Sequence, residues 1–140
     1  MPKTIAIFGS RLRYANRDYM LTVEAFLKIY EKGDSIVSGG CPVGGDLFAE
    51  WIAKERKIKI VRIVRDVSGS AFKAVKKPAL VVHIPEWSVY GQSAGFVRNG
   101  YIARDGDIGL AVARTDRKGG TEDTIRKMKK LGKKVILVDN

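Results

Sequence analysis

Three short stretches of the sequence combine glycines with residues that can bind an anion: Gly9-Ser10-Arg11, Ser38-Gly39-Gly40 through Gly44-Gly45-Asp46, and Gly119-Gly120-Thr121-Glu122. Each stretch follows an apolar run and stands before a helical pattern. Glycine permits sharp turns and a close approach of ligand to backbone. The first N–H groups of a helix have no intrahelical partner and lie at its positive end, so they suit a phosphate. One such turn equally fits an ordinary tight connection, but three at corresponding places predict a phosphate-bearing ligand.

Three carboxylates near these turns are candidates for catalysis. Asp46 could accept a hydrogen bond from a ribose hydroxyl, and it fits equally well as the N-cap of the helix that it opens. Glu122 and Asp123 stand in a helix start, where the helix dipole favours negative charge with or without a ligand. A nucleotide hydrolase would need one of the three near the ribose, so the catalytic role stays open among them.

Several other chemistries find no support in the sequence. It contains neither G-x-x-x-x-G-K-[ST] nor a G-x-G-x-x-G after the first apolar run, which argues against a P-loop NTPase and an ordinary dinucleotide dehydrogenase. One histidine and one cysteine cannot build a typical zinc site, and we expect no metal and no required cofactor. His83 lies in an apolar run and is expected in a strand, and Cys41 is interpreted as a small residue in a tight loop.

The segments that must position these turns alternate between strand and helix patterns. Tyr19, Val23, Phe26, Leu27 and Tyr30 form one helical stripe, with Asn16 as the expected N-cap. Residues 65–80 fit a loop with a short helix, and 80–84 fit a further strand or an extended edge. The other expected strands are 4–10, which breaks at Gly9, 34–40, 58–64, 107–113 and 133–139. The expected helices are 16–34, with Gly33 as the stop, 45–57, 93–106 and 119–132.

This alternation predicts an α/β fold with a doubly wound, mostly parallel sheet and helices on both faces. In such sheets a ligand binds beyond the carboxyl ends of the strands, near the point where the strand order reverses. The 140 residues form one expected domain, 1–140, and 45% hydrophobic and 29% charged residues are typical of a soluble globular protein.

Cysteine usage and charge bear on location and partners. A single cysteine excludes an internal disulfide, and no apolar run approaches a membrane span, so we expect a complete cytoplasmic chain without membrane contact. The formal charge of +11 favours anionic partners such as nucleotides or nucleic acid. Much of the excess lies in 54–59 and 126–134, which are interpreted as solvated helix faces and helix ends.

The motifs together resemble the SLOG superfamily, the Rossmann-like group that includes the DNA-processing protein Smf and the LONELY GUY phosphoribohydrolases. The small stand-alone proteins related to YspA and YpsA are the branch that the chain resembles most. The resemblance covers nearly the whole chain except 65–80. It is carried by the glycine turns at 38–46 and 119–121 and by Trp87, Tyr90, Gly91, Ala94, Gly95, Arg98 and Asn99.

The resemblance implies a three-layer Rossmann-like fold that binds a nucleotide or nucleotide-derived ligand at the carboxyl edge of the sheet. By position it implies ligand contacts from Gly9, Ser10, Arg11, Ser38, Gly39, Gly40, Gly44, Gly45, Asp46, Arg98, Asn99, Gly119, Gly120, Thr121 and Glu122. Arg98 and Arg11 could clamp phosphate in a bidentate manner. It also implies a homo-oligomer, a dimer or larger.

Two departures weaken the hydrolase interpretation. The phosphoribohydrolases carry P-G-G-x-G-T-x-x-E, whereas this chain reads KGGTEDT and has Thr124 three residues after Thr121. The second loop is one residue longer than S-G-G-A-R-G-A-D and lacks its arginine. We therefore favour a sensor or carrier of a phosphorylated nucleotide-like ligand. The alternatives are an N-glycosidic hydrolase and, third, a Smf-like single-stranded DNA binder, for which the chain lacks a basic stripe interleaved with aromatics.

Overall fold

A computed structural model of the chain describes residues 2–39, 44–64, 79–83 and 94–139. These residues form a parallel six-stranded sheet with the strand order β4-β3-β2-β1-β5-β6. The strands are β1 (Thr4–Gly9), β2 (Ser35–Ser38), β3 (Ile60–Val64), β4 (Ala79–His83), β5 (Ile108–Val112) and β6 (Lys134–Leu137). The helices are α1 (Asn16–Ile29), α2 (Gly45–Arg56), α4 (Ala94–Asp105) and α5 (Gly120–Lys130).

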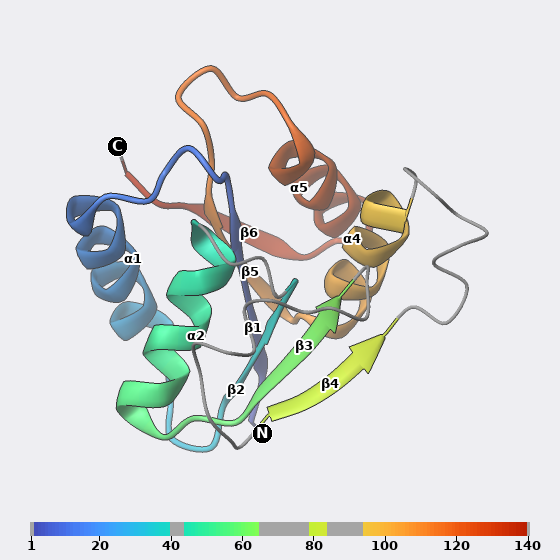
Figure 1. Cartoon of the computed structure of the whole chain (residues 1–140). Helices are drawn as coiled ribbons and strands as arrows, with labels where there is room; N and C mark the ends of the chain where they lie inside the picture. The colour runs from blue at the N-terminus through green and yellow to red at the C-terminus, as the bar shows by residue number, and fades with distance from the viewer. Residues whose placement is uncertain (1, 40–43, 65–78, 84–93, 140) are drawn as a thin grey trace.

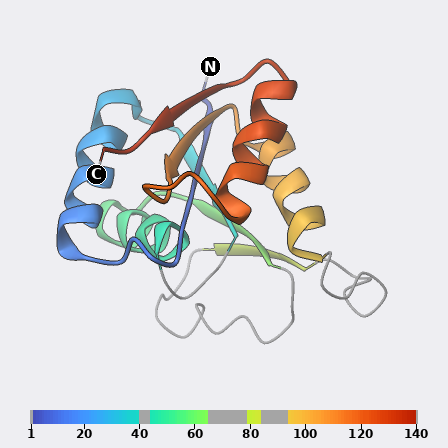
Figure 2. The ribbon, with the colours of Figure 1, turned by 90° about the horizontal axis from the view of Figure 1, so that it is seen from above.

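The helices cover both faces of the sheet, as Figures 1 and 2 show from two directions. Helices α1 and α2 pack on one face, where Ile5, Ile7 and Leu110 meet Phe26 and Ile52 in one buried cluster. Helices α4 and α5 pack on the other face, around a second cluster of buried residues: Ala6, Phe8, Val37, Ile102, Ala103, Ala111, Ala113, Ile125 and Met128. Alternate residues of β1 therefore point to opposite faces, as the twofold period of a strand requires. The predicted doubly wound α/β architecture is confirmed.

The chain builds the sheet outward from β1 to β4 and then returns to place β5 beside β1. The strand order reverses between these two central strands, which puts the switch point at the carboxyl ends of β1 and β5. Ligands of open parallel sheets bind at this position.

Local expectations were met except in a few places. The segment with two interpretations, 80–84, forms the edge strand β4 over Ala79–His83, which places His83 in a strand as expected. Helix α1 begins at Asn16, but its N-cap is Ala15 and not Asn16 as expected, and Ala15 donates its N–H to Asp18 Oδ2 at 3.2 Å. The prediction that Leu27 belongs to the core was wrong: its side chain is 49% exposed, and Thr22 is buried on this helix instead. Residues 65–78, Cys41, Trp87, Tyr90 and Gly91 lie outside the described residues.

The start of α2 packs directly on the backbone that leaves β1. A Cβ atom on Gly45 would lie 2.6 Å from Gly9 N and 2.7 Å from Phe8 C, and one on Gly44 would collide with the carbonyl group of Ser10. Gly44 also has a φ of +81°, a left-handed conformation that favours glycine. These two glycines let a helix N-terminus and the β1–α1 loop approach without side chains between them.

Within the described residues, none of the helices is long and apolar enough to cross a bilayer.

Candidate functional site

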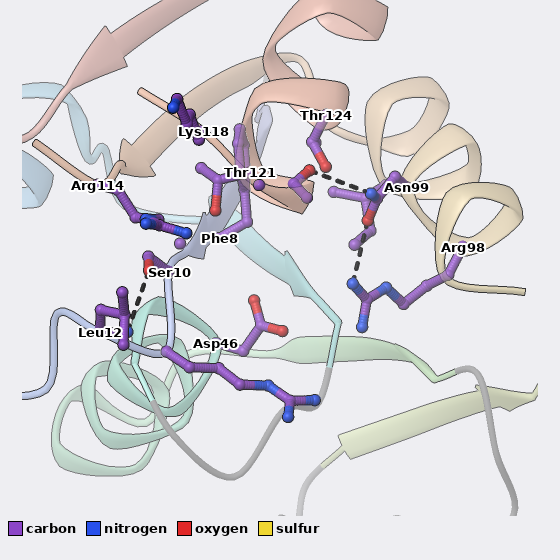
Figure 3. Close-up of a pocket in the computed structure, with 15 residues that line it drawn as sticks. Phe8, Ser10, Leu12, Asp46, Arg98, Asn99, Arg114, Lys118, Thr121 and Thr124 are labelled. Carbon is purple, nitrogen blue, oxygen red and sulfur yellow. Dashed lines mark hydrogen bonds between the residues drawn. The ribbon is translucent and has the colours of Figure 1, made fainter. Parts of the chain in front are cut away.

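A cleft of about 360 Å³ opens at the carboxyl ends of β1 and β5, between these strands and the starts of α2 and α5 (Figure 3). Its volume lies within the range of small-molecule binding sites. The described residues that line it are Phe8, Gly9, Ser10, Arg11, Leu12, Asp46, Arg98, Asn99, Ile102, Arg114, Lys118, Gly119, Gly120, Thr121 and Thr124. The cleft therefore stands at the switch point where the sheet topology predicts a ligand.

One side of the cleft is the N-terminus of α5. The N-cap Gly119 has a φ of +101° and supplies no side-chain cap, so the helix begins with bare backbone at Gly120 and Thr121. The first N–H groups of a helix lack intrahelical carbonyl partners, and the helix dipole adds partial positive charge there. This end of α5 can therefore donate hydrogen bonds to a phosphate.

The neighbouring side of the cleft comes from α4, where Asn99 connects two helices. The Asn99 side chain is buried; its Nδ2 donates to Gly120 O at 3.3 Å and to Asp123 Oδ2 at 3.2 Å. Asn99 Oδ1 accepts a hydrogen bond of 3.1 Å from Arg98 Nη2. Asp123 is further held by Lys127 at 2.8 Å. Asn99 thus fixes the start of α5 and orients the guanidinium of Arg98.

The guanidinium of Arg98 keeps an unused donor inside the cleft. Its Nε is buried and finds no hydrogen-bond partner among the described residues. Its Nη1 lies near the end of β2, where a Cβ atom on Gly39 would be 3.0 Å from it and 2.7 Å from Asp46 Oδ2. An unsatisfied buried donor costs about 1–3 kcal/mol, so an acceptor supplied by a ligand would relieve that cost.

The charges of the lining favour an anion. The described lining carries four basic side chains, Arg11, Arg98, Arg114 and Lys118, against the single carboxylate of Asp46. Arg114 and Lys118 belong to the β5–α5 loop and were missed by the sequence reasoning. Their signal is the basic run RTDRK that stands between a strand end and the glycine turn, because residues so placed must border the helix start.

The structure brings most of the predicted site residues to the cleft and puts the others elsewhere. Ser38 and Gly39 are buried at the end of β2, beside the lining, while Gly44 and Gly45 pack on the β1–α1 loop. Glu122 forms an ion pair of 2.8 Å with Arg117 and does not belong to the described lining. Of the three catalytic candidates, the described lining includes Asp46 alone. Gly40 lies outside the described residues. The side chains of the described residues form no cluster of three or more potential metal ligands.

No family model matches the sequence, and neither does any curated protein. Solved structures with the same fold do match. The single-stranded DNA-binding DNA processing protein A from Helicobacter pylori matches at 18% identity with a TM-score of 0.74, covering 97% of this chain and 65% of that one. The molybdenum cofactor carrier protein from Chlamydomonas reinhardtii matches at 19% identity with a TM-score of 0.69, covering 98% and 76%. The molybdenum cofactor binding protein from Rippkaea orientalis matches at 21% identity with a TM-score of 0.68, covering 98% and 76%.

These neighbours are SLOG-type Rossmann-like folds, so the resemblance inferred from the glycine turns is confirmed at the level of the fold. The chain has a Rossmann-like α/β fold with a cationic cleft at its switch point. It spans 65% of the length of DNA processing protein A.

Proposed function

We propose that this protein binds a small phosphorylated ligand, a nucleotide or a nucleotide-like molecule, in the cleft between β1 and β5, and that it acts as a sensor or carrier of that ligand. The observation that carries the proposal is that Arg98, whose buried Nε has no hydrogen-bond partner among the described residues, lines the same cleft as the uncapped start of α5. A phosphate group could accept hydrogen bonds from the guanidinium and from this helix start at once.

The structural neighbours support this class of ligand. The neighbour from Chlamydomonas reinhardtii is a molybdenum cofactor carrier, and the neighbour from Rippkaea orientalis is a molybdenum cofactor binding protein. A screen should therefore include this cofactor beside nucleoside mono- and diphosphates, NAD and cyclic nucleotides. A ligand present at about 100 times its dissociation constant stabilises the folded state by about 2.7 kcal/mol, which thermal unfolding detects readily.

The variant Arg98→Met tests the site, because it removes the guanidinium and keeps much of the length of the side chain. Loss of one charge-assisted hydrogen bond of about 2 kcal/mol should weaken binding of the best ligand roughly thirtyfold in isothermal titration calorimetry. Arg104→Met is the matched control on the same helix, because Arg104 is exposed and pairs with Asp105 at 2.8 Å. The proposal fails if no phosphorylated compound shifts the unfolding temperature, or if both variants weaken binding equally.

Single-stranded DNA is a second candidate ligand, because the neighbour from Helicobacter pylori binds it and four basic side chains line the cleft. Phosphate contacts make DNA affinity fall steeply with salt. Fluorescence anisotropy of a labelled thymidine oligonucleotide over a salt range of about 50–200 mM, in which such losses of affinity are large, tests this candidate. Absence of binding at the lowest salt would remove it.

A hydrolytic role is the third candidate, and it would rest on Asp46. The Glu122 carboxylate is bound to Arg117, and Asp123 is held by Asn99 and Lys127. Asp46 is buried in the first turn of α2 and lines the cleft, so it is the carboxylate closest to a bound ribose under this hypothesis. Product analysis by chromatography with wild type and Asp46→Asn would reveal turnover that depends on this group.

A further inference from the structure

A second cavity of about 270 Å³ lies next to the cleft. The described residues that line it are Leu12, Arg13, Asp18, Arg114, Thr115 and Asp116. Leu12 and Arg114 line both cavities, so these two side chains form the boundary between them. Figure 3 shows Leu12 and Arg114 on the same side of the cleft, with Ser10 between them.

The chemistry of the second cavity differs from that of the cleft. Both of its basic side chains are engaged by carboxylates: Arg13 Nε lies 3.0 Å from Asp18 Oδ1, and Arg114 Nη2 lies 2.7 Å from Asp116 Oδ2. Arg13 also donates to the carbonyl oxygens of Ala113 and Val138. The positive charges are thus balanced by neighbouring carboxylates, which would repel a second phosphate. The cavity suits an uncharged group that offers hydrogen-bond donors.

The boundary itself suits a flat ring. Leu12 is 64% exposed, although it stands between two cavities, so its apolar surface faces solvent rather than the core. Arg114 presents a planar guanidinium, a group that stacks on aromatic rings. An aromatic ring that crosses this boundary would cover the leucine and contact the guanidinium at the same time.

We infer that the ligand of the cleft is a nucleotide whose phosphate lies at the start of α5 and whose base crosses Leu12 and Arg114 into the second cavity, with base hydrogen-bond donors toward the Asp116 carboxylate. This inference rests on the proposed function and deepens it, because it assigns the base subsite and makes the base a large part of the affinity. Phosphate or a sugar phosphate alone would occupy only the cleft.

The test compares nucleoside monophosphates with ribose 5-phosphate by isothermal titration calorimetry. Wild type should bind the tightest of AMP, GMP, CMP and UMP at least about tenfold more tightly than ribose 5-phosphate, because covering an exposed leucine adds apolar burial. Leu12→Ala should weaken that nucleotide about five- to tenfold and leave ribose 5-phosphate within about twofold. Leu131→Ala is the matched control, because Leu131 is 56% exposed and lines neither cavity.

A second measurement locates the base directly. Hydrogen–deuterium exchange at Thr115 and Asp116, which line the second cavity and not the cleft, should slow with the nucleotide and stay unchanged with ribose 5-phosphate at equal occupancy. The base subsite would be overturned if wild type bound the two ligands with equal affinity, or if Leu12→Ala weakened both ligands equally. It would also be overturned if Leu131→Ala weakened nucleotide binding as much as Leu12→Ala does. Each of these results would leave the phosphate site intact. If neither ligand class binds wild type, the proposed function itself fails.

Discussion

Replacement of Gly45 by alanine separates a packing role of the second glycine loop from a ligand-binding role. A new Cβ atom would lie 2.6 Å from Gly9 N and 2.7 Å from both Gly9 Cα and Phe8 C, whereas ordinary contacts begin at 3.4 Å. All three atoms belong to the backbone at the carboxyl end of β1, so no side-chain rotation can relieve the clash. Helix α2 and β1 would have to separate by about 0.8 Å to bring the 2.6 Å contact to 3.4 Å.

The expected cost follows from overpacking. Insertion of a carbon into a well-packed site costs about 1–3 kcal/mol, and the rigid neighbours here place Gly45→Ala near 3 kcal/mol. Urea unfolding followed by circular dichroism would then show a midpoint lowered by about 1.5 M, taking a slope of about 2 kcal/mol/M. Ligand affinity of the fraction that remains folded should change little, because Gly45 does not belong to the described lining of the cleft.

Gly100→Ala is the matched control for this prediction. Gly100 lies inside α4, and a Cβ atom there would meet nothing within 4 Å. Alanine is favoured over glycine in a helix interior by about 0.5–1 kcal/mol, so this variant should be more stable than wild type. The packing argument is refuted if Gly45→Ala unfolds at the wild-type urea concentration, and a loss of ligand affinity in that stable variant would assign Gly45 to the ligand instead.

Two further predictions concern charged side chains. The buried carboxylate of Asp34 accepts hydrogen bonds from the backbone N–H groups of Lys3 and Glu31 and from Lys3 Nζ at 2.6 Å. Burial alone would raise the pKa of Asp34, but these contacts outweigh burial, so the pKa is lowered. Asp34→Asn should therefore lower the free energy of unfolding by about 1–3 kcal/mol at pH 7. A lowered carboxyl pKa stabilises the fold above the unfolded pKa of about 3.9. The difference in free energy of unfolding between Asp34→Asn and wild type should therefore shrink as the pH falls through the folded pKa, as measured by urea titrations. The control Glu31→Gln should change the free energy of unfolding little at any pH, because the Glu31 side chain is 84% exposed. Glu122→Gln should leave nucleotide affinity within about twofold in calorimetry, because the carboxylate pairs with Arg117 and does not belong to the described lining of the cleft. A large loss of binding or turnover would return Glu122 to the site.

The architecture could be predicted because its signals are local. Short apolar runs mark β1, β2 and β5, and the helical period marks α2 and α5, so the alternation of elements follows from the order of short patterns. The failure at Leu27 shows the limit of this reasoning. Its spacing fits the helical stripe, but Leu27 is 49% exposed, and the residues of α1 that the tertiary packing buries are Thr22 and Phe26.

The site could be predicted only in part. The glycine turns predicted a phosphate-binding edge of the sheet. Arg98 and Asn99 were predicted to bind the ligand because the family resemblance implied it. Arg114 and Lys118 were missed, because a basic loop has no pattern that separates a solvated run from the border of a cleft. Glu122 and Gly45 have the residue types expected of a binding site. However, Glu122 forms an ion pair with Arg117, and Gly45 packs on Gly9.

The sequence by itself determined that strands and helices alternate and that glycine turns open the helices, because those features depend on neighbours a few residues apart. Only the tertiary structure decided which turns face one another. The return of the chain from β4 to β5 places β5 beside β1, and Asn99 binds the start of α5 from α4. As a result, Arg98 lines the same cleft as a helix N-terminus more than twenty residues away in sequence. Such convergence depends on strand order and long-range packing, which no local period encodes.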